Sequence, residues 1–522
     1  MQRDIDRLAA AQLDLLVIGG GAYGVCAAWE AALRGLKVAL IDRGDFGAAT
    51  SSNSLHTMHG GLRYLQHFDI RRMRESIRER RFWLRAAPDL VTPMPFVLPT
   101  FGHGLRGPEV LQAALLMNDL ISIDRNRDVT PAVYLPRGRL VSQLAARQYL
   151  SSLNVSGFNG AALWYDGFNN SPERLLVALL QAASDSGARL ANYCAAEEVH
   201  CEGGRVVGAM VRDQLGGKAY SVRTHCVLNA TGPWVDTVAV MAGRHSGVPL
   251  FRPSRAMNLV VPRLPFGGAV GIPVLRKGLE RDTVLDKGAV TYFILPWGEC
   301  SLIGTKHSHC VGVVDTDEVT ALEVDEFLRE INPMLGRSRI HLRDIVAVKH
   351  GLLPEQAGAT PEGDVVLQKH SRIVDHERED GISRFVSIIG VKWTTARLVA
   401  EQAVELVLTK LQRRAAPFQR PRRLVVADAI KSPESNEVIS RDFEGQIQHV
   451  VKSQMAVQLC DTLFRRTTLG LGANLDERVL TRVAASMASA LGWSMTERDR
   501  QHHLAQAEFD RRSAWRAVPP TR

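Results

Sequence analysis

The sequence lacks the long apolar segments that membrane proteins and secreted precursors carry. No uninterrupted apolar run reaches the about 18 residues that a membrane-spanning helix needs. The N-terminus contains Asp4 and Asp6 and shows no apolar stretch followed by a small-residue cleavage site. We therefore expect neither a transmembrane helix nor a secretory signal.

Cysteine is scarce, and the seven cysteines are scattered without any CxxC spacing. An odd number of unpatterned cysteines indicates neither a disulfide framework nor a zinc site. The positions are Cys26, Cys194, Cys201, Cys226, Cys300, Cys310 and Cys460. We expect no metal site and a location in the reducing cytoplasm.

Acidic residues are fewer than basic residues, and the net charge is +9. Such a charge is compatible with three classes of partner: nucleic acid, an anionic membrane surface and an anionic small molecule. The basic residues concentrate in the ranges 71–85 and 410–423, which we interpret as a solvated helix face and a linker. Aromatic residues do not alternate with them, so nucleic acid is not an expected partner. Peripheral contact with anionic lipid on the inner face of the membrane stays open.

The rest of the composition is that of a globular protein, and the chain opens on a recognisable unit. Its 522 residues, 45% of them hydrophobic and 23% charged, suggest two or three domains. The segment "LDLLVIGGGAYGVCAAWEAALRGLKVALID" predicts strand, glycine turn, helix and strand. Gly19, Gly21 and Gly24 form GxGxxG at the turn, and Asp42 ends the second strand. This spacing predicts a dinucleotide whose pyrophosphate lies on the helix N-terminus and whose ribose bonds the acid.

The order of later elements favours FAD over NAD. We predict a helical segment at 69–90, a helix and strand over 171–193, and a hairpin turning at Gly203–Gly204. Residues 251–345 are richer in strand patterns, with "VTYFILPWGECSLIGT" the clearest pair. A nicotinamide enzyme would continue its βα units without this interruption, whereas flavoproteins divide the nucleotide-binding domain in this way.

A polar loop, "ATSSNSLHTMHGGLRYLQHF" (49–68), follows the opening unit. Its hydroxyls and backbone N–H groups can bond flavin and pyrophosphate oxygens, and its glycine pair permits close approach of a ring. Arg63 can grip an anion with two parallel hydrogen bonds. In "GVKWTTARLVAEQ", Thr394 or Thr395 suits the N-cap of a helix whose positive end would stabilise negative charge on a reduced flavin.

Six ordered motifs together resemble a known family. They are the opening unit, "ATSSNSLHTMHGGLRYL", "LNATGPWVD", "FILPWGECSLIGT", "GVKWTTARLVAEQAVE" and "CDTLFRRTTLGL". The chain is identified as similar to FAD-dependent glycerol-3-phosphate dehydrogenases, within the DAAO-like flavoprotein superfamily. The resemblance implies an α/β fold with a split Rossmann-like FAD-binding domain, a β-rich substrate domain and a C-terminal helical domain. It also implies hydride transfer from a secondary alcohol of a small anionic polyol phosphate to flavin N5, with quinone or O2 as electron acceptor.

The implied divisions and site residues are as follows. The FAD-binding domain comprises 14–75, 150–250 and 346–411, the substrate domain 76–149 and 251–345, and the helical domain 424–522. The expected cofactor-binding residues are Gly19, Gly21, Ala22, Tyr23, Gly24, Asp42, Arg43, Thr50, Ser51, Ser52, His59, Gly60, Gly61, Ala230, Thr231, Gly232, Gly390, Lys392, Trp393 and Thr394. The expected catalytic residues are His59, Arg63, Tyr64, Lys392 and His307, with His59, His307 and His350 as candidate bases.

The resemblance breaks where the family holds its substrate. The family arginine that grips phosphate aligns with Leu353, and the lysine before the HGG motif aligns with His56. Other departures are Asn258, Lys306, His307, Val391 and Ala396. The cations that could rebuild an anion site are Lys306, His307, Lys349, His350, Lys369 and His370.

Several alternatives stay open at this point. The substrate can be a different hydroxy compound or an amine of a specialised pathway. The protein can also be a non-catalytic flavin-binding module. His56 and His59 leave room for covalent attachment of the flavin, and a homodimer is not excluded.

Overall fold

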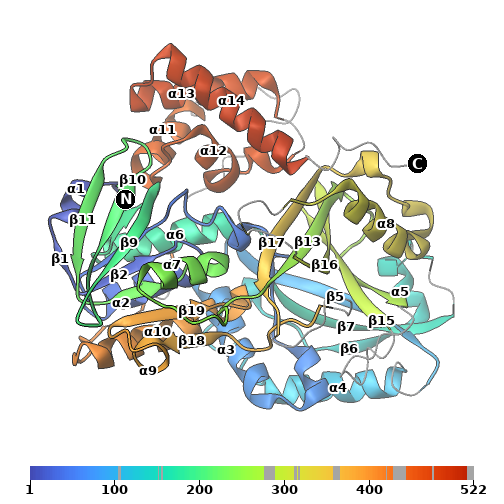
Figure 1. The fold of residues 1–522 in the computed structure, drawn as a ribbon. Coiled ribbons are helices and arrows are strands. Elements are labelled where there is room, and N and C mark those ends of the chain that lie inside the picture. The colour runs from blue at the N-terminus through green and yellow to red at the C-terminus, as the bar shows by residue number, and fades with distance from the viewer. Residues whose placement is uncertain are drawn as a thin grey trace.

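The computed structural model describes residues 1–103, 107–150, 152–154, 157–275, 289–310, 314, 318–356, 365–418, 420–421, 423–426, 443–472 and 475–513. Figure 1 shows β-sheets surrounded by helices, with the C-terminal helices gathered at one end. Parts of the predicted ranges 251–345 and 424–522 lie outside the described residues.

A six-stranded sheet carries the glycine-rich turn. Its strands in spatial order are β18 (Arg372–Asp375), β19 (Phe385–Ile389), β12 (Val227–Asn229), β2 (Leu15–Ile18), β3 (Val38–Ile41) and β8 (Arg189–Ala191). All neighbours are parallel apart from β18 and β19. Every residue of β2 and β3 is buried, because layers cover both faces of the sheet. This arrangement confirms the predicted βαβ unit.

Helices cover one face of this sheet, and a second sheet helps to cover the other. The helices α2 (Ala22–Leu33), α6 (Pro172–Asp185) and α10 (Ala396–Lys410) share one hydrophobic core (Figure 1). On the opposite face lie α7 (Val235–Met241) and the four-stranded sheet of β1 (Gln12–Leu13), β11 (Ala219–Thr224), β10 (Arg205–Asp213) and β9 (Cys194–Glu202). The predicted hairpin joins β9 to β10, with φ of +56° and +75° at Gly203 and Gly204. Both glycines suit a two-residue turn that needs positive φ.

A nine-stranded sheet forms the second large layer. Its strands are β17 (Ala347–Pro354), β13 (Pro253–Pro262), β16 (Cys300–His309), β15 (Ala289–Trp297), β14 (Ala269–Leu275), β5 (Val91–Phe101), β7 (Phe158–Asn169), β4 (Thr57–Met58) and β6 (Arg139–Ser142). The β15–β16 pair confirms the strongest strand prediction, and α8 (Ala321–Leu335) packs on one face. The predicted domain boundaries stay a prediction, and β7 and β17, assigned to the FAD-binding part, hydrogen-bond within this sheet.

The basic run 71–85 lies in α3 (Ile70–Ala86), which has one exposed and one buried face. Arg71 is 90% exposed, but Arg80 is buried and paired with Asp166. Glu79, also buried, pairs with Arg397 of α10. The interpretation of this run as a solvated face is therefore wrong for the inner side of the helix, where paired charges are buried beside apolar residues.

The range 410–423 leads from α10 towards the C-terminal helices. Two of its arginines pair with buried acids: Arg413 lies 2.6 Å from Asp14, and Arg420 lies 2.7 Å from Glu30. The remaining helices are α1 (Ile5–Ala9), α4 (Pro108–Ile121), α5 (Gln143–Leu150), α9 (His376–Glu379), α11 (Phe443–Gln454), α12 (Leu459–Asp461), α13 (Glu477–Leu491) and α14 (Met495–Arg512). Among the described helices, none is both long and apolar enough to cross a bilayer.

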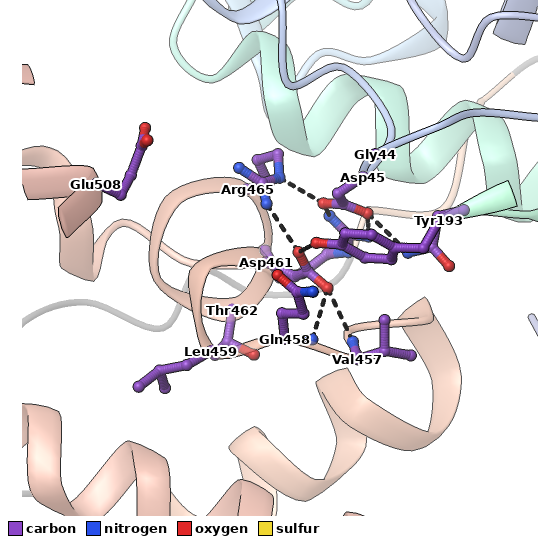
Figure 2. Close-up of polar contacts among 12 residues, drawn as sticks. Gly44, Asp45, Tyr193, Val457, Gln458, Leu459, Asp461, Thr462, Arg465 and Glu508 are labelled. Carbon is purple, nitrogen blue, oxygen red and sulfur yellow. Dashed lines mark hydrogen bonds and ion pairs between the residues drawn. The ribbon is translucent and has the colours of Figure 1, made fainter. Parts of the chain in front are cut away.

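Buried charges join the C-terminal helices to the loop after β3 (Figure 2). Asp45 accepts hydrogen bonds from Arg465 and, at 2.8 Å through both carboxylate oxygens, from Arg466. Arg465 also donates to Asp461 at 2.7 Å, and the Tyr193 hydroxyl donates to the same carboxylate oxygen at 2.5 Å. Burial alone would raise the pKa of Asp45, but the two arginines hold it well below its usual value. The helical group is thus docked by ion pairs in the protein interior.

Candidate active site

The glycine-rich turn lies between β2 and α2, at the carboxyl edge of the six-stranded sheet. Gly19 has a φ of +103°, and a Cβ there would lie 2.7 Å from the carbonyl oxygen of Ala230. A Cβ at Gly24 would lie 1.8 Å from the carbonyl oxygen of Gly19. Gly21 is the N-cap of α2 and supplies no capping side chain, which leaves the N–H groups of Tyr23 and Gly24 in the first turn suited to a phosphate. Three further predicted cofactor residues follow β12 at this edge: Ala230, Thr231 and Gly232.

The predicted ribose acid lies beside this turn. Asp42 accepts hydrogen bonds from the backbone N–H groups of Gly20 at 2.6 Å and Gly44 at 2.9 Å. Burial raises the pKa of Asp42 to about 6, against the lowering effect of those two bonds. The Arg43 guanidinium stacks 4.2 Å from the ring centroid of Trp234. The acid is therefore placed where the spacing predicted it.

The hydroxyls of the polar loop fasten the loop to its neighbours. Thr50 Oγ1 lies 3.2 Å from both the carbonyl oxygen and the amide nitrogen of Leu352 in β17. Ser51 Oγ accepts from the Ala22 N–H of α2 at 2.9 Å, and Ser52 Oγ donates to the Gly47 carbonyl at 2.5 Å. The bond from Ala22 to Ser51 holds the loop against the glycine-rich turn. The expected contacts between these hydroxyls and a flavin stay predictions.

The start of α10 meets the start of α2. The Tyr23 hydroxyl donates to the Lys392 carbonyl at 2.8 Å, and a Cβ at Gly390 would lie 2.2 Å from the Tyr23 ring. Trp393 Nε1 donates at 3.1 Å to the Ser51 carbonyl. The two predicted halves of the cofactor site, separated by more than 300 residues of sequence, are thus in direct contact.

The paired threonines differ from the expected capping arrangement. Thr395 is the N-cap of α10 but makes no capping hydrogen bond through its side chain. Thr394 is 1% exposed, and its Oγ1 has no hydrogen-bond partner among the described residues. A buried hydroxyl without a partner is costly, so this atom is available to a bound polar group.

Tyr64 is the centre of a cationic cluster that includes Lys392, just before α10. Its hydroxyl accepts from Lys392 Nζ at 2.7 Å, and Nζ also lies 3.2 Å from Ser76 Oγ in α3. The Arg72 guanidinium lies 4.2 Å from the Tyr64 ring centroid. His59 packs edge-on against the same ring at 5.8 Å between centroids. Three predicted catalytic residues therefore come together.

The protonation of this cluster follows from burial and like charge. Burial first, and then Arg72, lowers the pKa of Lys392 to about 7. Burial, Lys392 and Arg72 lower the pKa of His59 to about 3, so the imidazole is neutral at physiological pH. Burial raises the pKa of Tyr64, which keeps its hydroxyl protonated. Arg63 is exposed at the rim of the cluster.

The glycine pair of the loop is required by packing within the protein. A Cβ at Gly60 would lie 2.4 Å from the Arg80 guanidinium, and the Gly60 N–H donates to Asp166 at 2.6 Å. Gly61 has a φ of +83°, and a Cβ there would lie 2.4 Å from the Tyr64 ring. Close approach of a cofactor is therefore not needed to explain either glycine.

The remaining candidate bases lie on opposite faces of the nine-stranded sheet. His307 and Gly351 both pair with Ala256, whereas His350 pairs with Met257. Cross-strand partners share a face and successive residues alternate, so His307 lies on the face of Gly351, which packs against the polar loop at Thr50. His350 lies on the other face. His307 thus stays a candidate beside the loop, and His350 does not.

The sequence did not predict two residues of the cluster, Arg72 and Ser76. Arg72 and Ser76 stand four residues apart on α3 and so share a helix face. Both lie in the range 71–85, for which the sequence predicts a solvated helix face. The apolar residues Met73, Ile77 and Leu84 at helical spacing marked a buried side of this helix, but they do not show what that side contacts.

The residues present fit FAD at both ends. The glycine turn admits no side chain at position 24 and presents a helix N-terminus, as a pyrophosphate requires. Asp42 lies at the end of β3 for the ribose, and the unpartnered Thr394 hydroxyl lies at the start of α10 for the flavin. His56, a candidate for covalent attachment, instead lies 3.1 Å from Lys349 Nζ and packs against Trp297.

Comparison with known proteins agrees with this geometry. Residues 14–406 match the family described as FAD dependent oxidoreductase, and residues 421–498 match the C-terminal domain of alpha-glycerophosphate oxidase. A glycerol-3-phosphate dehydrogenase of Synechocystis sp. is 29% identical, over 96% of each chain. Glycerol-3-phosphate dehydrogenase 2 of Mycobacterium tuberculosis is 31% identical over 79% of this chain, which spans 66% of that protein's length.

A solved structure shows the same fold across nearly the whole chain. The glycerol-3-phosphate dehydrogenase from Bacillus halodurans complexed with FAD superposes with a TM-score of 0.72 at 20% identity, covering 99% of this chain and 98% of that one. The predicted fold class is confirmed.

Proposed function

The chain belongs to the family of FAD-dependent oxidoreductases, and on that premise we propose that it oxidises the secondary alcohol of a small polyol phosphate, with sn-glycerol 3-phosphate as substrate. The observation that carries the proposal is the Lys392–Tyr64 hydrogen bond of 2.7 Å within a cationic cluster that touches the cofactor site. The names of the similar proteins support this substrate class.

Each residue of the cluster has a chemical task in this proposal. FAD, when bound, accepts the hydride. Lys392, held by the Tyr64 hydroxyl, binds the anionic group of the substrate and so orients its carbon chain. A ring nitrogen of the neutral His59 takes the hydroxyl proton, and the bound anion of the substrate raises the low pKa of this imidazole towards the range that a base needs. Arg63 at the rim attracts the anion to the site.

Activity should depend on the charge of Lys392. Its pKa of about 7 means that the ammonium is charged below that pH and neutral above it. We expect kcat/KM to fall by about tenfold per pH unit above pH 7, because kcat/KM reports the free enzyme. Lys392→Arg keeps its charge across this range, so its profile should be flat there. An unchanged fall in Lys392→Arg would assign the titration to another group.

The substrate is tested by adding sn-glycerol 3-phosphate anaerobically to the flavin-loaded protein. We expect loss of the yellow flavin absorption, with glycerol as the control that lacks the phosphate. A flavin that dithionite reduces but sn-glycerol 3-phosphate leaves yellow would refute this substrate. Reduction by an amine or by an unphosphorylated alcohol would place the protein in a different branch of the family's chemistry.

The electron acceptor and the site of action belong to the same proposal. We propose that quinone reoxidises the protein at the inner face of the membrane, as the net charge of +9 favours contact with anionic lipid. Arg413, Arg420 and Arg423 already pair with acids, so the contact would involve other basic residues. Sedimentation with anionic vesicles, and its loss at high salt, tests the contact. Faster reoxidation by O2 than by quinone would favour an oxidase.

A further inference from the structure

The proposed function leaves the binding of the substrate's anion incomplete. Leu353 aligns with the arginine that grips phosphate in the glycerol-3-phosphate dehydrogenase family. A leucine side chain cannot donate a hydrogen bond to an anion. Two of the cations that could replace it are already paired: Lys306 Nζ lies 2.8 Å from Glu330, and Lys349 Nζ lies 3.6 Å from Glu173. β17 therefore contains no arginine that could bind the substrate's anion together with Lys392.

Arg72 of α3 lies beside Lys392, on the same tyrosine ring. Its guanidinium and Lys392 Nζ both contact the Tyr64 ring, at 4.2 Å and 4.5 Å from the ring centroid. Two cations that share one aromatic ring repel each other unless a negative group lies with them. Within the described residues no carboxylate forms an ion pair with Arg72, and its Nε is buried without a hydrogen-bond partner.

The neighbouring acids are engaged elsewhere. Asp69 caps α3 by accepting from the Arg72 backbone N–H at 3.1 Å, and Glu75 lies 3.4 Å from Arg71 Nε. Burial and Arg72 lower the pKa of Lys392, and the opposing effects of Glu75 and Asp69 are smaller. The local balance of charge around the Tyr64 ring is therefore positive.

The orientation of Arg72 suits an anion. A guanidinium stacked on an aromatic ring uses its flat face there, so its N–H donors at the edge stay available. Those donors form a planar fork that matches carboxylate and phosphate oxygens. The unsatisfied Nε is one of these donors, and leaving it buried without a partner costs free energy that a bound anion would recover.

We propose that Arg72, together with Lys392, binds the anionic group of the substrate. Arg72 thereby replaces the family arginine that aligns with Leu353. This assignment rests on the proposed function for the identity of the substrate. The anion contact itself requires no turnover and is tested separately.

The first experiment measures binding of inorganic phosphate to the flavin-loaded protein by the perturbation of flavin absorption. Arg72→Leu is expected to weaken binding about ten- to hundredfold, and Arg72→Lys should recover part of it. Arg71→Leu is the matched control, because Arg71 is 90% exposed on the same helix and should bind phosphate as the unaltered protein does. Binding that is absent in the unaltered protein, or equal in Arg72→Leu, would overturn the proposal.

The second experiment separates contact with the anion from a structural role. Arg72→Leu should raise KM for the polyol phosphate by a similar factor and leave kcat nearly unchanged, as loss of uniform binding does. Because Arg72 lowers the pKa of Lys392, its removal should also move the fall in kcat/KM to higher pH. An unmoved pH profile would overturn the proposal. If the unaltered protein binds phosphate but no polyol phosphate reduces its flavin, the proposed function fails while the anion site stands.

Discussion

Replacing Gly24 with alanine is expected to leave a protein that retains little FAD. The added Cβ would lie 1.8 Å from the carbonyl oxygen of Gly19, and that atom is backbone that cannot move aside alone. The start of α2 must therefore separate from β2, which displaces the N–H groups that would hold the pyrophosphate. Overpacking of this kind costs about 1–3 kcal/mol or more even where the surroundings can adjust.

The measurement is the ratio of flavin to protein absorbance after purification, together with the melting temperature. Gly247→Ala is the matched control, because a Cβ at Gly247 would meet none of the described heavy atoms within 4 Å and its φ lies outside the left-handed region. We expect Gly247→Ala to stay yellow. A fully flavin-loaded Gly24→Ala protein would show that the turn does not bind the cofactor.

Replacing Asp45 with alanine is expected to destabilise the protein by about 3–5 kcal/mol, the usual cost of removing one partner of a buried ion pair. The change leaves Arg465 and Arg466 buried without their shared carboxylate (Figure 2). The helices from α11 onwards should then separate from the loop after β3, which also carries Asp42. We therefore expect faster proteolysis between α10 and α11 and weaker retention of FAD.

Chemical unfolding of the two proteins measures the difference in stability, and an exposed ion pair is the control. Asp89 and Arg423 are 51% and 62% exposed in their side chains, so Asp89→Ala should cost at most about 1 kcal/mol. Because the pKa of Asp45 is lowered on folding, its contribution is present above the ordinary carboxyl pKa of about 4 and is lost as the pH falls further. Equal stability of the Asp45→Ala and Asp89→Ala proteins would contradict this role.

The cofactor half of the site could be predicted because its signals are local. Gly19, Gly21 and Gly24 stand at a spacing that one strand, one turn and one helix impose, so the chain within about thirty residues defines the geometry. Asp42 follows the same logic, since a parallel neighbour strand ends at the same edge of the sheet. The sequence also marked Lys392 and Tyr64, through the resemblance and not through any local pattern.

The substrate half could not be predicted in the same way. A basic residue in an amphipathic run looks the same whether its helix face meets solvent or a cation-binding tyrosine. The sequence therefore predicts that Arg72 is solvated. In the structure α3 packs against Tyr64 and the segment before α10, and Arg72 lies over the tyrosine ring. Likewise, His307 and His350 look equivalent in sequence, and only the strand register places them on opposite faces.

The sequence alone thus determined the family and the cofactor, through six ordered motifs, and the βαβ unit with its glycine turn, because periodicity and glycine spacing act over one or two elements of structure. The tertiary structure decided which charges meet. Lys392 reaches Tyr64 across 328 positions and Arg465 reaches Asp45 across 420. The strength of such contacts depends on burial and on distances of a few ångströms, which a linear order of residues does not contain.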